Sequence, residues 1–122
     1  MSKYENKKIG DWGEEVAAKY LRARGYDIIK RNYRCYFGEI DIIARRGPNL
    51  VFVEVKTKTS NRFGLPEEMV DSVKIEKINN IINYVLGRWN GPEPIVRMDV
   101  ISVIRDRYGG LYDIKHIENF DI

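Results

Sequence analysis

The stretch GEIDIIARRGPNLVFVEVK, residues 38–56, has the pattern of two β-strands joined by a tight turn. Ile, Val, Leu and Phe dominate both halves, and the Gly-Pro-Asn run at residues 47–49 is typical of a turn. If the chain reverses between residues 47 and 48, residue i lies opposite residue 95 − i in an antiparallel pair. This register places Asp41 opposite Glu54 and predicts that the two carboxylates are neighbours.

Two carboxylates held side by side between strongly apolar strands need a further partner. An unpaired charge in such a place costs several kcal/mol, so the pair must share a proton or bind a cation. Mg²⁺ prefers oxygen ligands of this kind, and Mn²⁺ is a possible substitute. Asp41, Glu54 and the main-chain carbonyl of Val55 supply such a set of oxygens. The hairpin therefore predicts a divalent metal site.

Lys56 comes two residues after Glu54 and so lies on the same face of the strand. A lysine beside a metal site can orient or deprotonate a water and counter the charge that develops on a phosphate. The two acids, a divalent metal ion and Lys56 together are the groups that metal-assisted hydrolysis of a phosphodiester uses. The same register sets Glu39 opposite Lys56, which taken alone is an ordinary cross-strand ion pair. A slip of one residue would send one of the acids to the other face and remove the site.

The rest of the chain predicts two helices and three more strands. Apolar residues recur at helical spacing over residues 8–24, where Gly25 stops the helix, and again over residues 70–85, ending near Gly87. Strand-like runs cover residues 26–33, 95–104 and 111–117. The order α-β-β-β-α-β-β predicts an α/β fold in which helices flank a central mixed sheet.

The first predicted helix offers a third acid. At about 100° per residue, Glu14 lies at the edge of the apolar arc, whereas Glu15 points toward solvent. Glu14 is therefore the acid expected to face inward and to reach the metal site directly or through water. The alternative is a solvated acid at the helix edge that interacts favourably with the helix dipole.

Length and composition limit the classes of protein to which the chain can belong. The 122 residues suit a single domain, 1–122, and 43% hydrophobic with 32% charged residues are typical of a globular protein. The longest uncharged stretch, residues 78–87, is too short for a bilayer span of about 20 residues, and the charged start predicts no secretion signal.

A single cysteine, Cys35, agrees with a reducing compartment, so we expect a cytoplasmic protein with no membrane partner. Cys35 and the lone His116 offer no zinc cluster and are interpreted as incidental.

Basic charge is concentrated in the first part of the chain. The net charge is +3, and residues 1–35 carry nine basic against five acidic side chains, which is a weak indication of an anionic partner. Arg31 and Arg34 lie in the run RNYR, which interleaves basic and aromatic residues, and Lys58, Arg62 and Phe63 follow Lys56. These four basic residues are predicted to contact the backbone phosphates of a nucleic acid. For any one of these residues, a solvated surface charge is an equal alternative.

Four runs of sequence resemble a known family. GDWGEEVAAKYL, GEIDIIA, VFVEVKTKTSNRFG and RMDV, spread over residues 10–103, are similar to the YraN family of small bacterial proteins. That family is placed in the restriction-endonuclease-like, or PD-(D/E)XK, superfamily alongside archaeal Holliday-junction resolvases. The resemblance implies a restriction-endonuclease-like core. It also implies that Asp41 and Glu54 bind the metal, that Lys56 is the catalytic lysine, and that Glu14 is the helix acid of the resolvase-like branch.

These patterns together predict a Mg²⁺-dependent endonuclease that acts on DNA, on a branched or otherwise structured substrate in repair or recombination. By analogy with resolvases, which cut two strands at once, we expect a homodimer. One alternative is a non-catalytic nucleic-acid-binding module of the same fold, and another is a scaffold protein whose acids form ordinary ion pairs. Asp99 has two open interpretations, as a partner of Arg97 or Arg105, or as an outer part of the site.

Overall fold

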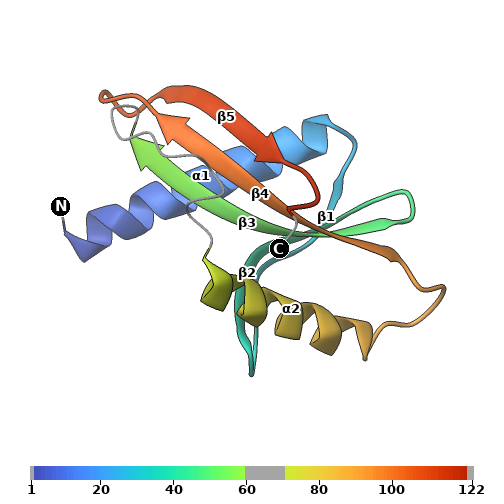
Figure 1. Cartoon of the computed structure of the whole chain (residues 1–122). Coiled ribbons are helices and arrows are strands. Elements are labelled where there is room, and N and C mark those ends of the chain that lie inside the picture. Colours follow the sequence, from blue (N-terminus) through green and yellow to red (C-terminus); the bar gives the residue numbers. More distant parts are fainter. Residues whose placement is uncertain (1, 60–70, 121–122) are drawn as a thin grey trace.

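The computed structural model of the chain describes residues 2–59 and 71–120, and within them a five-stranded sheet lies between two helices (Figure 1). The elements in chain order are α1 (Lys3–Ala23), β1 (Asp27–Cys35), β2 (Gly38–Arg46), β3 (Asn49–Thr59), α2 (Ser72–Leu86), β4 (Ile95–Arg105) and β5 (Leu111–Ile117). The predicted order of helices and strands is confirmed. In the described ranges, neither helix is long and apolar enough to cross a membrane.

The hairpin of β2 and β3 has the predicted register. Ile42 lies opposite Val53 and Arg46 opposite Asn49, so the paired residue numbers add up to 95. The strands follow one another across the sheet in chain order, with β3 and β4 parallel and the other neighbours antiparallel. Because parallel neighbours need a crossover, α2 lies in the connection between β3 and β4. The sheet is therefore mixed, as predicted.

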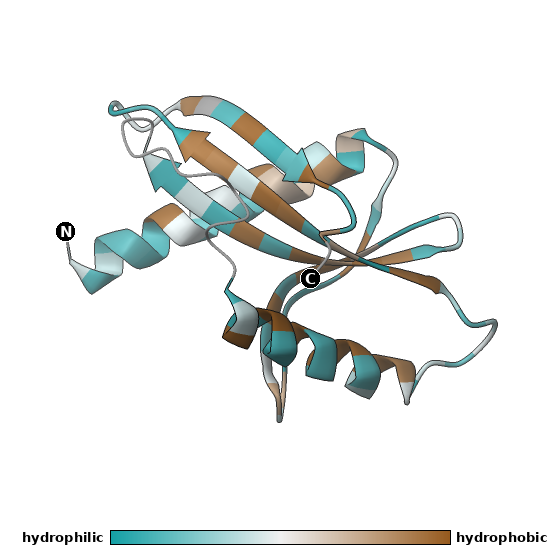
Figure 2. Cartoon of the chain, in the orientation of Figure 1, coloured by the Kyte–Doolittle hydropathy of each residue, from teal (hydrophilic) through white to brown (hydrophobic). Residues whose placement is uncertain are grey.

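Helix α1 begins five residues earlier than its apolar pattern predicts. The Ser2 hydroxyl accepts a hydrogen bond from the Glu5 main-chain N–H at 3.1 Å and so caps the helix. The first turns are charged and carry no apolar stripe, which Figure 2 shows as a hydrophilic start of α1. The end of the helix agrees with the prediction, because Gly25 follows with a φ of +85°.

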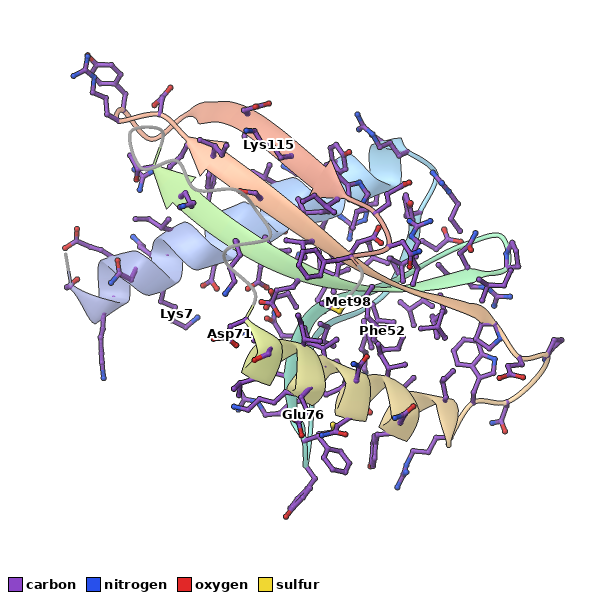
Figure 3. The ribbon with its side chains drawn as sticks, in the orientation of Figure 1. Lys7, Phe52, Asp71, Glu76, Met98 and Lys115 are labelled. Carbon is purple, nitrogen blue, oxygen red and sulfur yellow. The ribbon has the colours of Figure 1, made fainter. Side chains whose placement is uncertain are left out.

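The two helices bury opposite faces of the sheet, because alternate residues of each strand point to opposite sides. On β3, Val51 and Val53 pack toward α1, whereas Leu50 and Phe52 pack toward α2. Figure 3 shows Phe52 and Met98 between the sheet and α2. The central strands are therefore buried on both faces, as their continuous apolar sequence predicts.

The sheet opens between β2 and β3 at Ile42. The ladder between these strands ends at the pair Ile42 and Val53, although β2 continues beside β1 as far as Gly38 and β3 continues beside β4 as far as Thr59. Figure 1 shows the β1–β2 hairpin turning away from β3 beyond this point. Asp41 is the first residue of β2 outside the ladder, so the opening lies at the predicted acidic site.

Helix α1 packs closely against β3 at Gly13. A side-chain carbon added at Gly13 would overlap the Thr57 hydroxyl, whereas one added at Gly10 would meet nothing within 4 Å. Gly13 therefore sets how near the helix comes to the strand. It also sets the position of the next residue, Glu14.

We expect Gly13→Ala to lower the free energy of unfolding by about 1–3 kcal/mol, because the added methyl group must push α1 away from β3. Gly10→Ala is the matched control on the same helix. It should raise stability by about 0.5–1 kcal/mol, since alanine favours a helix over glycine and the methyl group has space. Urea denaturation of the three proteins measures both effects. Equal stabilisation by the two substitutions would contradict the close packing at Gly13.

Candidate metal centre

Asp41 bridges the opening between β2 and β3. Beyond the end of the ladder, the main-chain N–H of Val55 donates a hydrogen bond to Asp41 Oδ2 over 2.8 Å. The carboxylate therefore stands where a strand partner would otherwise pair with β3. This contact holds Asp41 beside Glu54, which precedes Val55 on β3.

Glu54 is buried, with 3% of its surface exposed. Burial is the largest cause that raises the pKa of Glu54 to about 8, and the charge of Asp41 and a hydrogen bond with Asp41 raise it further. The structure thus brings the two acids into contact, as the predicted register requires. Both the burial and the contact oppose a state in which the two carboxylates are charged without a cation.

Two lysines approach the same oxygen of Glu54. The Lys56 Nζ lies 3.9 Å from Glu54 Oε1, and the Lys74 Nζ from α2 lies 3.5 Å from it. Their charges lower the pKa of Glu54 but do not outweigh burial and Asp41. Lys56 is where the hairpin predicts it, whereas Lys74 was not among the predicted site residues.

Glu14 reaches the site from α1, on the other face of the sheet. Burial raises the pKa of Glu14 to about 7, and the next largest cause is the negative charge of Asp41. This influence of Asp41 places the two carboxylates close enough to interact. The inward orientation that the helical arc predicts for Glu14 therefore agrees with the structure.

The donors at this centre suit a hard divalent cation. Asp41 and Glu54 offer carboxylate oxygens in contact with each other, and the carbonyl of Val55 belongs to the residue whose N–H binds Asp41. Every predicted ligand is an oxygen, as Mg²⁺ prefers. Glu14 adds a third carboxylate within electrostatic reach.

The expected pairing of Glu39 with Lys56 is wrong. Glu39 lies outside the β2–β3 ladder and opposite Arg34 on β1, whose NH2 group donates to Glu39 Oε2 at 2.8 Å. The reason is the opening of the sheet, because β2 has already left β3 at this point. Glu39 is thus held by the β1–β2 hairpin rather than by the strand that carries Lys56.

The four predicted phosphate contacts lie in different surroundings. Arg31 is partly buried and donates a hydrogen bond to Glu15 Oε2 over 2.7 Å, so it links β1 to α1. Glu15 is therefore held by Arg31 and is not simply directed to solvent as expected. Arg34 is largely exposed despite its ion pair with Glu39. Lys58 is half-buried on β3, and Arg62 lies outside the described residues.

Asp99 belongs to a separate buried network. It is fully buried on β4 and accepts hydrogen bonds from Arg97 Nε at 2.9 Å and from the Asn119 main-chain N–H at 2.9 Å, and it lies 2.7 Å from His116 Nε2. Burial opposes its ionisation, but the hydrogen bonds from His116 and Arg97 outweigh it and lower the pKa of Asp99.

Of the two open interpretations of Asp99, pairing with Arg97 is the one observed. The interpretation of His116 as incidental is wrong, because its ring also meets Tyr20 Oη at 3.1 Å.

The same network contains a second group of potential metal ligands. Asp99, His116 and Glu118 have ligand atoms that all lie within 4.8 Å of one another. Arg97 already supplies positive charge there, because it donates to Asp99 and lies 3.7 Å from Glu118. A cation at this group would have to approach a guanidinium, which disfavours metal binding.

The raised carboxyl pKa values predict how stability depends on pH. Glu54 and Glu14 retain protons in the folded protein up to pH values near 8 and 7, whereas in the unfolded chain they lose them near the ordinary value of 4.5. The folded state therefore binds more protons across this interval, and the free energy of unfolding should fall as pH rises from about 5 to 8. Chemical denaturation in EDTA measures this trend.

Glu54→Gln should reduce this pH dependence and leave only the part due to Glu14, because the amide does not titrate. Glu76→Gln, on the exposed surface of α2, is the matched control and should leave the dependence unchanged (Figure 3). Stability that rises with pH over this interval in the parent protein would contradict the crowding of the acids.

Comparison with known proteins gives consistent matches over most of the chain. The family model described as "Uncharacterised protein family UPF0102" matches residues 13–103. A UPF0102 protein of Clostridium acetobutylicum is 44% identical over 114 residues, which cover 93% of each chain. Another, from Caldanaerobacter subterraneus subsp. tengcongensis, is 45% identical over 120 residues, which cover 98% of each chain. A third, from Syntrophomonas wolfei, is 41% identical over 93% of this chain and 97% of its own.

Proposed function

The chain belongs to the UPF0102 family, and we propose from its acidic site that it is a metal-dependent endonuclease that hydrolyses phosphodiester bonds of DNA. The observation that carries this proposal is the contact between Asp41 and Glu54, with Lys56 at 3.9 Å, where the sheet opens. A mixed sheet that opens at two acids between two helices also supports the restriction-endonuclease-like core that the sequence resemblance implies.

In this proposal Asp41 and Glu54 hold the metal ion, with the carbonyl of Val55 as a third oxygen. Val55 also fixes the orientation of Asp41 through its N–H. Mg²⁺, or Mn²⁺ in its place, would supply positive charge that polarises the phosphate and lowers the pKa of a bound water. The burial of Glu54 keeps bulk water from screening its interaction with the cation.

Lys56 and Glu14 supply the groups that act on water and protons. The Lys56 Nζ can orient the attacking water and balance negative charge that develops on the phosphate. Glu14 has a pKa raised to about 7, which suits a carboxyl that exchanges protons near neutral pH. It approaches from the opposite face of the sheet, so its proposed role is to assist proton transfer rather than to hold the metal ion.

A non-catalytic nucleic-acid-binding module is the second candidate function. One observation favours it: Glu54 already has lysine nitrogens at 3.5 and 3.9 Å, so the acid is partly balanced without a metal ion. A module of this kind would bind DNA but leave it intact.

A cleavage assay tests the proposal. Purified protein is incubated with labelled duplex, single-stranded and four-way-junction DNA, in Mg²⁺, in Mn²⁺ and in EDTA. We expect products with either metal and none in EDTA, and faster cutting of the junction than of the plain duplex. Binding without cutting for every substrate and both metals would overturn the nuclease in favour of the binding module.

A further inference from the structure

A cavity lined mainly by lysines lies beside Glu54, between β3 and the first turns of α2. Its volume is about 260 Å³, and its lining residues are Lys56, Asp71, Val73, Lys74 and Lys77. Figure 3 shows Asp71 at the start of α2. Lys56 and Lys74 are the two residues that also approach the Glu54 carboxylate, so the cavity adjoins the candidate metal centre.

The residues that line this cavity carry more positive than negative charge. Lys56 and Lys74 share the single carboxylate of Glu54. Asp71 caps the helix, because its Oδ1 accepts a hydrogen bond from the Lys74 main-chain N–H at 2.9 Å. Lys77 is exposed one turn further along α2, and within residues 2–59 and 71–120 no acid lies within ion-pair distance of it. The lining therefore carries three lysines and one carboxylate, Asp71.

This excess grows if Glu54 binds a metal ion, a step that rests on the proposed function. The Glu54 carboxylate then balances the charge of the cation, so it no longer balances the charges of Lys56 and Lys74. A divalent ion beside unpaired ammonium groups is unfavourable until an anion enters. The cavity therefore requires negative charge in the state in which the site would work.

We propose that the lysine cavity binds a backbone phosphate of a nucleic-acid strand, next to the phosphate held at the metal centre. Lysine ammonium groups bind phosphate as compact point charges. Lys74 and Lys77 are three residues apart on one helix, so they form a short row of charges about 5–6 Å apart that leads away from Glu54. Such a row fits successive phosphates of a strand better than one free phosphate ion.

Lys77→Gln tests this site without touching the groups around Glu54. The parent protein and the variant are titrated into a fluorescein-labelled single-stranded oligonucleotide in EDTA, and binding is followed by anisotropy at several salt concentrations. The logarithm of the association constant falls linearly with the logarithm of the salt concentration, and loss of one phosphate contact should make this slope shallower by roughly 0.7. The corresponding loss of affinity at about 0.1 M salt is about fivefold. Lys115→Gln, on β5 and with the same change of charge, should alter neither quantity (Figure 3).

The outcomes separate this site from the proposed nuclease. If Lys77→Gln binds DNA with the affinity and salt slope of the parent protein, or if the parent protein does not bind the oligonucleotide, the cavity is not a strand site. A titration with inorganic phosphate that depends on Lys77, while DNA binding does not, assigns the cavity to free phosphate and also overturns the proposal. Weakened DNA binding by Lys77→Gln, in a protein that cuts no substrate, upholds the phosphate site and rejects only the nuclease.

Discussion

Lys56→Ala should lower the rate of metal-dependent DNA cleavage by about 100-fold to 10,000-fold, the range typical of losing a group that handles a proton or charge in the reaction. The Lys56 Nζ lies 3.9 Å from Glu54 Oε1, close enough to act on a water or phosphate held at the same centre. Its removal takes positive charge away, so it should not weaken the binding of a cation. The expected result is therefore a protein that binds metal but cuts slowly.

Single-turnover cleavage of the best DNA substrate measures this loss, and calorimetric titration of Mg²⁺ measures metal affinity in the same variant. Lys115→Ala is the control, because Lys115 is exposed on β5 and far from the opening of the sheet in Figure 3. Cleavage by Lys56→Ala at the rate of the parent protein would remove Lys56 from the mechanism.

Glu54→Gln and Asp41→Asn should each weaken the binding of Mg²⁺ or Mn²⁺ by roughly 100-fold or more, because each removes a charged oxygen ligand from a buried centre. Both substitutions keep the size of the side chain. Glu54→Gln also relieves the burial of a charge, so the folded protein should remain at least as stable at pH 8. Loss of metal affinity would then not come from unfolding.

Glu118→Gln is the matched control for metal affinity, since Glu118 belongs to the second acidic group with Asp99 and His116. Calorimetry should show unchanged affinity for that variant. If Glu118→Gln weakens metal binding and Glu54→Gln does not, the metal belongs to the second group and the assignment of Asp41 and Glu54 fails.

The contact of Asp41 with Glu54 was predictable because it follows from local rules. The turn at residues 47–49 and the apolar pattern on either side set the hairpin register, and one residue of slip would have exposed a buried face. The spacing of Glu54 and Lys56 then places both side chains on one face of β3. The same local information also predicted the bounds of β2 and the glycine that follows α1.

The missed features depend on contacts between distant parts of the chain. Glu39 meets Arg34 instead of Lys56 because β2 leaves β3 at Ile42, and no turn or spacing signals where a ladder ends. Lys74 approaches Glu54 only after α2 has packed on the sheet. A lysine on an amphipathic helix has the pattern of an ordinary surface residue, so the sequence alone does not distinguish it.

The Asp99 network was missed for a related reason. Asp99 on β4 meets His116 on β5, and the His116 ring meets Tyr20 on α1, so residues from three elements are joined. A lone histidine carries no motif that predicts such partners. Ser2, by contrast, carries a capping signal that would have predicted the earlier start of α1.

The position of a bound metal ion tests the central claim most directly. Crystals of the protein with Mn²⁺, measured near the Mn absorption edge, should show an anomalous peak between the carboxylates of Asp41 and Glu54. A peak at Asp99, His116 and Glu118, or no peak beside Asp41 and Glu54, would contradict the account.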